Sequence, residues 1–283
     1  MVVALIRRLS SAALVVIGVS LCTFFIARVI PGDPAALIAG PMATEAELER
    51  LRSTLGLDRP LWEQYWTYAT AAAQGDFGTS LVTGTPVLEE LFARMPATLE
   101  LMAAATLLGI FGGIVLGVLA ALNRDRAVDH AVRAGAVVAI SMPGFWLGVL
   151  LLLVFYGLLG WAPGPGRSSL APLGPTGFLT LDALLHGDFE RLADALAHLA
   201  LPAITLALAD IGGLARLVRA AMITALQEEH VRTARASGTP ERVVVWTIAL
   251  RNALVPFIGM AGVLIAQMLY GAVATETIFA WPG

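Results

Sequence analysis

Long apolar stretches are the feature that most constrains how this chain can fold. A helix needs about 20 apolar residues to cross the hydrocarbon core of a bilayer. Five stretches reach that length, and we place them at Leu9–Ile30, Ala97–Leu122, Ala134–Gly160, Leu196–Val218 and Ala253–Thr275. The chain is 58% hydrophobic and 14% charged, whereas soluble domains are closer to half apolar and a quarter charged. The sequence therefore predicts an all-α, polytopic membrane protein with five transmembrane helices.

The distribution of arginine predicts how these helices are oriented. Cytoplasmic segments carry an excess of positive charge, and the excess is clearest in the segments 123–130 and 219–252. If the N-terminus, with Arg7 and Arg8, lies inside, both segments are cytoplasmic and the segment 31–96 lies outside. We therefore expect a single transmembrane domain over residues 1–283, in the inner (cytoplasmic) membrane of a cell, with a cytoplasmic N-terminus.

Residue usage excludes several kinds of chemistry on this chain. Its 18 Lys and Arg residues are all arginine, so the lysine of a Walker-type phosphate loop and the lysine of a Schiff-base enzyme are both missing. The net charge of −3 and the lack of a basic run argue against nucleic acid as a partner. No second ligand stands at metal-binding spacing from His198 on its helix. We expect no catalytic residue, no metal and no cofactor on this chain.

The outer segment 31–96 is predicted to form helices of its own. Thr44 and Glu47 have the spacing of a capping box, and the helix that they start is expected to end near Gly56. Pro60 is expected to open a second helix rich in Trp and Tyr, and Pro86 a third, amphipathic one. Aromatic rings at this level suit a membrane interface.

Glycines spaced four residues apart mark two of the predicted spans. This spacing lets helix backbones approach closely inside lipid. It occurs at Gly109, Gly113 and Gly117 of the second span and at Gly144 and Gly148 of the third. We favour packing within the chain, and a face for a second membrane subunit is the alternative.

Prolines and one acid indicate where the spans face protein or water rather than lipid. Pro143, Pro202 and Pro256 lie in or beside spans, and each frees backbone groups that only protein or water can satisfy. Asp210 is the sole acid in the middle of a span. Because a carboxylate inside a membrane is costly, such a residue is a candidate for function. Two interpretations are open: it lines a translocation path, or it is a neutral carboxyl bonded to a neighbouring helix.

An intramembrane serine protease is a hypothesis of a different class. Ser20 is the one serine in a Gly-x-Ser-x setting within a span, and of the four histidines only His198 lies near membrane depth. A serine protease needs a base within reach of its hydroxyl and oxyanion donors. The Ser20 hydroxyl is instead expected to bond the backbone of its own helix.

The charged run Glu228–Trp246 stands out in this apolar chain. It predicts a short cytoplasmic helix that stops at Gly238, followed by a second helix for which Thr239 is the N-cap and Pro240 the first residue. A slim helix held between two spans suits the groove of a partner protein. The candidate contact residues are Val231, Arg232, Thr233, Ala234, Arg235, Ala236, Ser237 and Gly238. An ordinary solvated loop is the alternative.

These residues carry a family resemblance. The sequence RTARASG followed by IALRNALVP resembles the cytoplasmic EAA loop of ABC-transporter permeases of the dipeptide/oligopeptide subfamily. Further stretches resemble successive segments of that family, in the same order over nearly the whole chain: RVIPGDPA, PVLEELFARMPATLEL, VLAALNRDRAVDH, SMPGFWLGVLLLLVFYGLLGWAPG, HLALPAITLALA and ETIFAWPG. The chain is most similar to the first of two permease subunits.

The resemblance implies the ABC importer permease fold and a set of partners. These are a second, homologous permease forming a heterodimer, two cytosolic subunits that bind ATP and Mg, an extracytoplasmic binding protein, a peptide substrate and the lipid bilayer. The short helix would be the coupling helix that docks on the ATPase subunits.

Three departures from the family pattern stand out. Arg232-Thr233-Ala234 replaces the Glu-Ala-Ala of the general motif, and Arg251 stands where that motif has proline. Members of the family also continue into a sixth span, which this sequence lacks.

Two other transport functions stay open. The same type of importer serves nickel complexes, glutathione or other small solutes in related systems. A stand-alone secondary transporter or channel would be expected to show inverted repeats around charged midplane groups, and the sequence shows no repeat.

Overall fold

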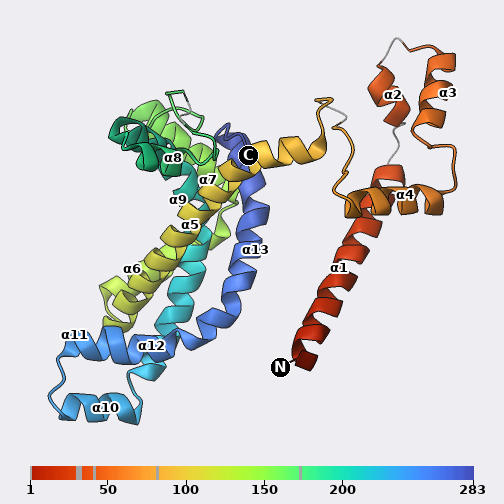
Figure 1. The fold of residues 1–283 in the computed structure, drawn as a ribbon. Helices are drawn as coiled ribbons and strands as arrows, with labels where there is room; N and C mark the ends of the chain where they lie inside the picture. Colours follow the sequence, from red (N-terminus) through yellow and green to blue (C-terminus); the bar gives the residue numbers. More distant parts are fainter. Residues whose placement is uncertain (1, 30–33, 41–42, 81–82, 172–173) are drawn as a thin grey trace. The chain divides into compact units, whose positions relative to one another are not determined.

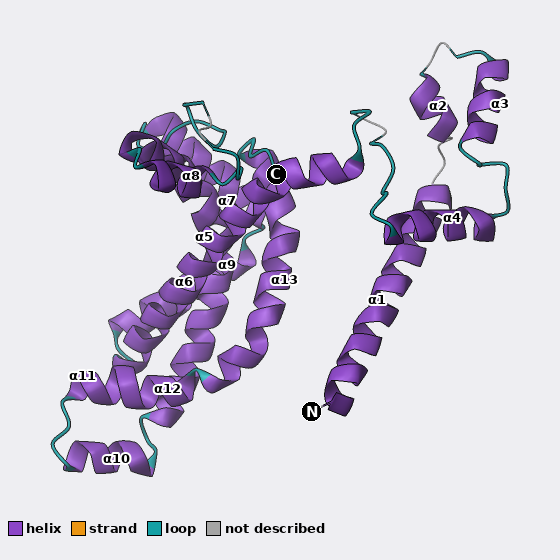
Figure 2. Cartoon of the chain, viewed as in Figure 1, coloured by secondary structure: helices purple, strands orange, loops and turns teal. Residues whose placement is uncertain are grey.

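The computed structural model describes residues 2–29, 34–40, 43–80, 83–171 and 174–283. They divide into two compact units, Met1–Phe92 and Ala93–Gly283, and each is described by itself. Helices and the loops between them make up both units (Figure 2). The predicted all-α fold is therefore confirmed for the described residues.

The first unit consists of a long apolar helix and three shorter ones. They are α1 (Val2–Val29), α2 (Pro34–Ala39), α3 (Glu45–Thr54) and α4 (Leu61–Ala73). The predicted capping box opens α3: the Thr44 amide donates to Glu47 Oε2 at 2.8 Å, and the Thr44 side chain pairs with the backbone amide of Glu47. Gly56, in the left-handed region at φ 64°, follows the end of this helix as expected.

The aromatic helix α4 lies across the C-terminal end of α1 within this unit (Figure 1). The Tyr65 ring meets the Phe24 ring edge-on at 5.5 Å between centroids, and the Tyr65 hydroxyl is 2.9 Å from Ser20 Oγ. Ser20 Oγ also lies 2.9 Å from the Ile17 carbonyl, so the predicted bond to its own helix backbone is confirmed. Trp62 and Trp66 stay 70% and 67% exposed, as interfacial aromatic residues do.

The second unit is a bundle of long helices with short ones at its ends. In chain order the elements are α5 (Val87–Leu122), α6 (Ala127–Ser141), α7 (Gly144–Leu151), the π-helix η1 (Leu152–Leu158), α8 (Leu179–His186), α9 (Phe189–Ala225), α10 (Glu229–Ala236), α11 (Glu241–Val243), the π-helix η2 (Val244–Ala249), α12 (Leu250–Ala253) and α13 (Val255–Ile278). The first helix, α5, begins before the boundary between the units.

Two predicted elements differ from the structure. The helix expected from Pro86 and the span expected from Ala97 are one continuous helix, α5, which runs through Pro96. A single proline removes one backbone hydrogen bond, and here the next residue, Ala97, is fully buried in the bundle. The span expected at Ala134–Gly160 is broken into α6 and a second helical stretch, Gly144–Leu158, bent by 107°. Met142 precedes Pro143 and is extended, as residues before proline tend to be.

Three of the described helices are long and apolar enough to cross a membrane, or four if the bent pair is one span. These three are Leu5–Ile26, Val87–Leu122 and Phe189–Ala225, and they correspond to the first, second and fourth predicted spans. The described stretch Gly262–Ile278 of α13 is apolar but shorter. The chain therefore has several membrane-length helices, and the total of five stays a prediction.

Close backbone packing between α5 and α9 holds the bundle together. A Cβ added to Gly113 would lie 2.6 Å from Leu214 Cβ, and one added to Gly117 would lie 2.7 Å from Val218 Cβ. Only glycine leaves room for these side chains, so the glycine spacing of α5 serves packing within the chain, as favoured from the sequence. Gly148 likewise faces α9, since a Cβ added there would lie 3.2 Å from Thr205 Cγ2.

Candidate functional site

The charged run forms a compact loop of two short helices at one end of the bundle. Figure 1 shows α10 beyond the end of α9 and alongside α11 and α12. Val231 of α10 is completely buried, in an apolar cluster with Met222 of α9 and Val244 of η2. This one side chain anchors α10 to the bundle, because the rest of the helix is mostly polar.

The predicted contact residues fall into two groups. Val231 is covered by the chain's own core and Ala234 is partly covered, so neither offers a free apolar face. The others are exposed: Arg232, Thr233, Arg235, Ala236, Ser237 and Gly238. The surface available to a partner is therefore the arginine-bearing side of α10 and its C-terminal end, and it excludes the candidate residue Val231.

A glycine turn connects α10 to the next helix. Gly238 adopts φ 78°, in the left-handed region, and its amide donates to the Arg235 carbonyl at 3.0 Å. The predicted stop at Gly238 is thus confirmed. The next helix begins at Glu241 with Pro240 as its N-cap, one residue later than predicted. The first helix, Glu229–Ala236, ends two residues before Gly238, with Glu228 as its N-cap and Ser237 as its C-cap.

An ion pair closes this turn. Arg235 donates from Nη2 to Glu241 Oε1 at 2.6 Å and from Nε to Oε2 at 3.1 Å. The hydrogen bonds from Arg235 lower the pKa of Glu241, and the same bonds raise the pKa of Arg235. A bidentate pair fixes both distance and angle between its partners. We call this pair the loop clamp.

One further contact ties the loop to α12, and another lies within the loop itself. His230 Nε2 lies 2.9 Å from Asn252 Nδ2 of α12, and His230 Nδ1 lies 3.1 Å from Glu228 Oε2. Together with Val231 and the loop clamp, they hold α10 at its start, its middle and its end.

A buried ion pair joins α6 to α9. Arg219 donates from Nε and Nη2 to the two carboxylate oxygens of Asp129, at 2.5 and 2.6 Å. Asp129 is fully buried and also accepts from the Asp125 amide at 3.0 Å. This pair was not predicted from the sequence, because its partners are 90 residues apart and no local pattern connects them.

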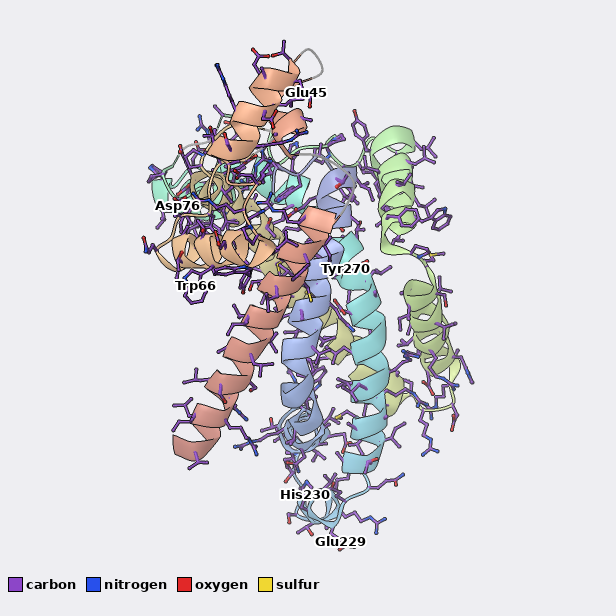
Figure 3. All side chains as sticks on the ribbon, turned by 90° about the vertical axis from the view of Figure 1, so that its right-hand side faces the viewer. Glu45, Trp66, Asp76, Glu229, His230 and Tyr270 are labelled. Atoms are coloured by element: carbon purple, nitrogen blue, oxygen red, sulfur yellow. The ribbon has the colours of Figure 1, made fainter. Side chains whose placement is uncertain are left out.

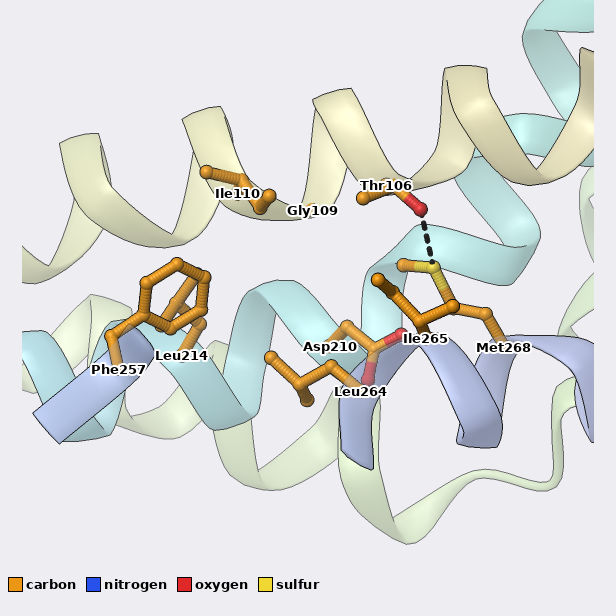
Figure 4. Close-up of a pocket in the computed structure, with 9 residues that line it drawn as sticks. All are labelled: Thr106, Gly109, Ile110, Asp210, Leu214, Phe257, Leu264, Ile265 and Met268. Carbon is orange, nitrogen blue, oxygen red and sulfur yellow. Dashed lines mark hydrogen bonds between the residues drawn. The ribbon is translucent and has the colours of Figure 1, made fainter. Parts of the chain in front are cut away.

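Asp210 faces two hollows of the second unit. One is a narrow cavity of about 30 Å³ between α5, α9 and α13, lined by Thr106, Gly109, Ile110, Asp210, Leu214, Phe257, Leu264, Ile265 and Met268 (Figure 4). The other is an open groove of about 600 Å³ bordered by Phe145 of α7 and Tyr270 of α13. Within the described part of the chain Asp210 has no hydrogen-bond or ion-pair partner, so the interpretation as a carboxyl bonded to a neighbouring helix finds no support there.

The two prolines predicted to line a path take different positions. Pro143 is exposed and caps α7 at the bend after α6. Pro202 is fully buried inside α9, three residues before Thr205, which lines the open groove. The open groove therefore includes Asp210, whereas Pro143 and Pro202 are not among the residues that line it.

A second polar network closes the other end of the bundle. Glu100 of α5 accepts from Arg167 Nη2 at 2.5 Å and from the Thr180 amide at 2.8 Å. The Arg167 guanidinium lies over the Trp281 ring at 5.4 Å from its centroid, and Trp281 Nε1 donates to the Ala97 carbonyl at 2.9 Å. These residues were not singled out from the sequence, because Glu100, Arg167 and Trp281 are far apart in the chain and no local pattern connects them.

Comparisons with known proteins agree with this geometry. A family model described as "Binding-protein-dependent transport system inner membrane component" matches residues 113–283. A second model, for the N-terminal part of such a membrane component, matches residues 1–102.

Three curated relatives illustrate the similarity. A probable D,D-dipeptide transport system permease of Escherichia coli K12 is 50% identical over 98% of this chain and 82% of its own length. A di/tripeptide transport system permease of Pseudomonas aeruginosa is 42% identical over 98% of this chain and 83% of its own length. A glutathione transport system permease of Escherichia coli O1:K1 is 37% identical over 98% of this chain and 82% of its own length.

Proposed function

The chain belongs to the family of inner membrane components of binding-protein-dependent transport systems, and on that premise we propose that it forms half of the translocation path of a peptide importer. It is the permease subunit of an ABC importer of the dipeptide/oligopeptide type, and it carries neither an ATPase nor a cofactor of its own. The peptide substrate is supported by the D,D-dipeptide and di/tripeptide relatives, at 50% and 42% identity.

The loop around α10 is the proposed docking site for the ATPase subunits. The observation that carries this proposal is the way α10 is held: Val231 is buried against α9 and η2, while Arg232, Thr233 and Ala236 stay exposed. A partner that moves this helix also moves α9, since the two share one apolar cluster. ATP binding at the partner subunits would then reorient the spans through a difference in contacts at α10.

The open groove beside Asp210 is the proposed wall of the path, shaped by Pro143 and Pro202. It lies among α7, α9 and α13, and the exposed residues of α13 continue its surface: Tyr270 is 89% and Val273 67% exposed. A second, homologous permease is the proposed partner that completes the path across from this face. Two cytosolic ATPase subunits and an extracytoplasmic binding protein complete the assembly.

Substitution at the tip of α10 tests the docking proposal. In the assembled importer, Ala236→Trp places a bulky ring on the exposed C-terminal end of α10. We expect substrate-stimulated ATP hydrolysis and peptide uptake to fall together, at least about tenfold, because a clash at a docked helix costs more than 1.4 kcal/mol. The matched control is Ala193→Trp, an exposed alanine on α9, which should keep both activities. If Ala236→Trp keeps both as well, α10 does not touch the ATPase.

Glutathione is the second candidate substrate, because one relative at 37% identity carries that name. Glutathione has the size of a tripeptide and carries an ammonium and carboxylates, as peptides do. Recognition of these groups would therefore suit both glutathione and short peptides. Calorimetry with the cognate binding protein decides between them: tight binding of dipeptides and none of glutathione supports the peptide importer.

A further inference from the structure

The outer part of the first unit contains a polar pocket that the transport cycle described above does not use. It has a volume of about 350 Å³ and lies between the end of α1, the turn after α3, the helix α4 and the loop 76–78. Its polar lining consists of Arg28, Arg59, Gln64, Thr67, Tyr68 and Asp76. This volume is in the range of pockets that hold small ligands.

The charges of the pocket are not neutralised by one another. Within the described ranges, neither Arg28 nor Arg59 is paired with a carboxylate, and Asp76 is not paired with a cation. Arg28 lies over the Phe24 ring at 5.5 Å from its centroid, and Asp76 Oδ1 accepts only from the Gly78 amide, at 2.9 Å. Two guanidinium groups and one carboxylate thus face the same space with capacity for further hydrogen bonds.

A buried acceptor in the pocket lacks a donor. Gln64 Nε2 donates to the Leu57 carbonyl at 3.1 Å and to the Arg59 carbonyl at 2.7 Å. These two bonds fix the side-chain amide, and its other atom, Oε1, is buried with no hydrogen-bond partner. Leaving a buried acceptor unsatisfied costs about 1–3 kcal/mol. A donor group on a ligand would remove that cost.

The position of the pocket indicates a water-soluble ligand. Leu21 and Phe25 of α1 and Trp62 and Trp66 of α4 line a separate, apolar groove, which suits the membrane side of α4. Figure 3 shows Trp66 below α4 and Asp76 above it. The pocket therefore opens on the side of α4 away from the apolar groove, toward α3 and the aqueous side.

We propose that this pocket binds a short peptide with free ends, with its carboxylate at Arg28 and Arg59 and its ammonium at Asp76 and Gln64 Oε1. Arginine forks match a carboxylate in a bidentate manner. An ammonium brings three donors, enough for Asp76 and for the unsatisfied Gln64 oxygen. The inference rests on the proposed peptide import, and it places a second peptide site on the permease itself, apart from the translocation path.

Ligand and protein variants together test this assignment. The assembled importer in nanodiscs, without its binding protein, is titrated calorimetrically with alanyl-alanine. Arg59→Gln and Asp76→Asn are each expected to weaken binding about tenfold, because each removes a charged hydrogen-bond partner. The matched control is Arg50→Gln, an exposed arginine of α3 outside the pocket, which should bind as the unmodified chain does.

Blocked peptides assign each end of the ligand. N-acetyl-alanyl-alanine should lose its dependence on Asp76 and keep that on Arg59, while alanyl-alanine amide should show the reverse. If alanyl-alanine does not bind, or if all variants bind it equally, the pocket is not a peptide site. Displacement of the dipeptide by phosphoethanolamine at lower concentration than by a second dipeptide also overturns it, in favour of a lipid headgroup. Uptake with the binding protein present is measured in parallel, so a failure of peptide import itself is seen separately.

Discussion

At the scale of single residues, the pairing of Asp129 with Arg219 is the most consequential contact of the second unit. Both carboxylate oxygens of Asp129 are bonded by one guanidinium, and the aspartate is fully buried. Its neighbours on α6, Ala136 and Ala139, are buried too, so the pair lies where α6 packs on α9. The pair fixes the register of the two helices at the end of the bundle that carries α10.

Removing one partner of this pair should destabilise the unit strongly. We expect Arg219→Gln to cost about 3 kcal/mol, because it leaves the Asp129 carboxylate buried without its cation. The measurement is thermal unfolding of the detergent-solubilised chain. The double variant Asp129→Asn/Arg219→Gln should recover part of the loss, since no buried charge remains. A melting temperature unchanged in the single variant would contradict the role of the pair.

At the scale of elements, α5 and α9 approach each other at two glycines. Gly113 leaves room for Leu214, whose Cβ, Cγ and Cδ2 would all lie within 2.8 Å of an added Cβ. Leu214 belongs to the apolar cluster that also contains Val118 of α5 and Val218 of α9, so a change here separates α5 from α9 within that cluster.

Replacement of Gly113 by alanine therefore should weaken the bundle. We expect a loss of about 1–3 kcal/mol from overpacking, in spite of the gain of about 1 kcal/mol in helix propensity. Gly135 of α6 provides the control, because an added Cβ there meets nothing within 4 Å. Gly135→Ala should raise the melting temperature or leave it unchanged. Equal effects of the two substitutions on the melting temperature would show that helix propensity, and not packing, determines the stability change.

The loop clamp makes a prediction about pH as well as about rigidity. The pKa of Glu241 is lowered from its ordinary value of 4.5 by Arg235, so the clamp is fully formed above that value and is lost only as the pH falls through the lowered pKa. Exchange of the amides in segment 236–241, corrected for intrinsic rates, should thus be the same at pH 6 and pH 8.

The variant Glu241→Gln supplies the contrast for this experiment. It removes the carboxylate while keeping the size of the side chain, and should speed hydrogen exchange in the same segment by loosening the Gly238 turn. Thr224→Ala on α9, whose hydroxyl bonds only its own helix, should leave that exchange unchanged. A change of exchange between pH 6 and pH 8 in the unmodified chain would be evidence against the clamp.

At the scale of the whole molecule, the proposed orientation places α4 on the outer side of the cytoplasmic membrane and α10 on its cytoplasmic side. In a Cys22→Ser background, cysteine introduced at Thr233 should react with a membrane-impermeant thiol reagent only after the cells are opened. Cysteine introduced at Glu63 of α4 should react in cells whose inner membrane is intact. Labelling of Thr233→Cys in intact cells would contradict the predicted orientation, because α10 would then lie on the side of the membrane opposite to the cytosolic ATPase subunits.

Features that depend on neighbouring residues were predictable from the amino-acid sequence alone. Apolar runs of sufficient length become helices that span lipid, because backbone groups there are satisfied only within the helix. The capping box at Thr44 and the stop at Gly238 also follow from local hydrogen bonding, and both appear where the sequence placed them. The family resemblance also came from the sequence, because segments typical of the family follow one another in the same order. The comparisons show that family over nearly the whole chain.

Which side chains meet, in contrast, depends on how segments distant in the chain pack together. Asp129 and Arg219 lie 90 residues apart, and Val231 changes from a candidate contact residue to an anchor because η2 and α9 cover it. The break at Pro143 was visible in the sequence as a proline, whereas its 107° bend depends on what α6 and α7 pack against. Burial and ion pairing are properties of packed surfaces, and no local pattern contains them. The sequence thus specifies the spanning helices and their caps, and packing selects the contacts through which they act.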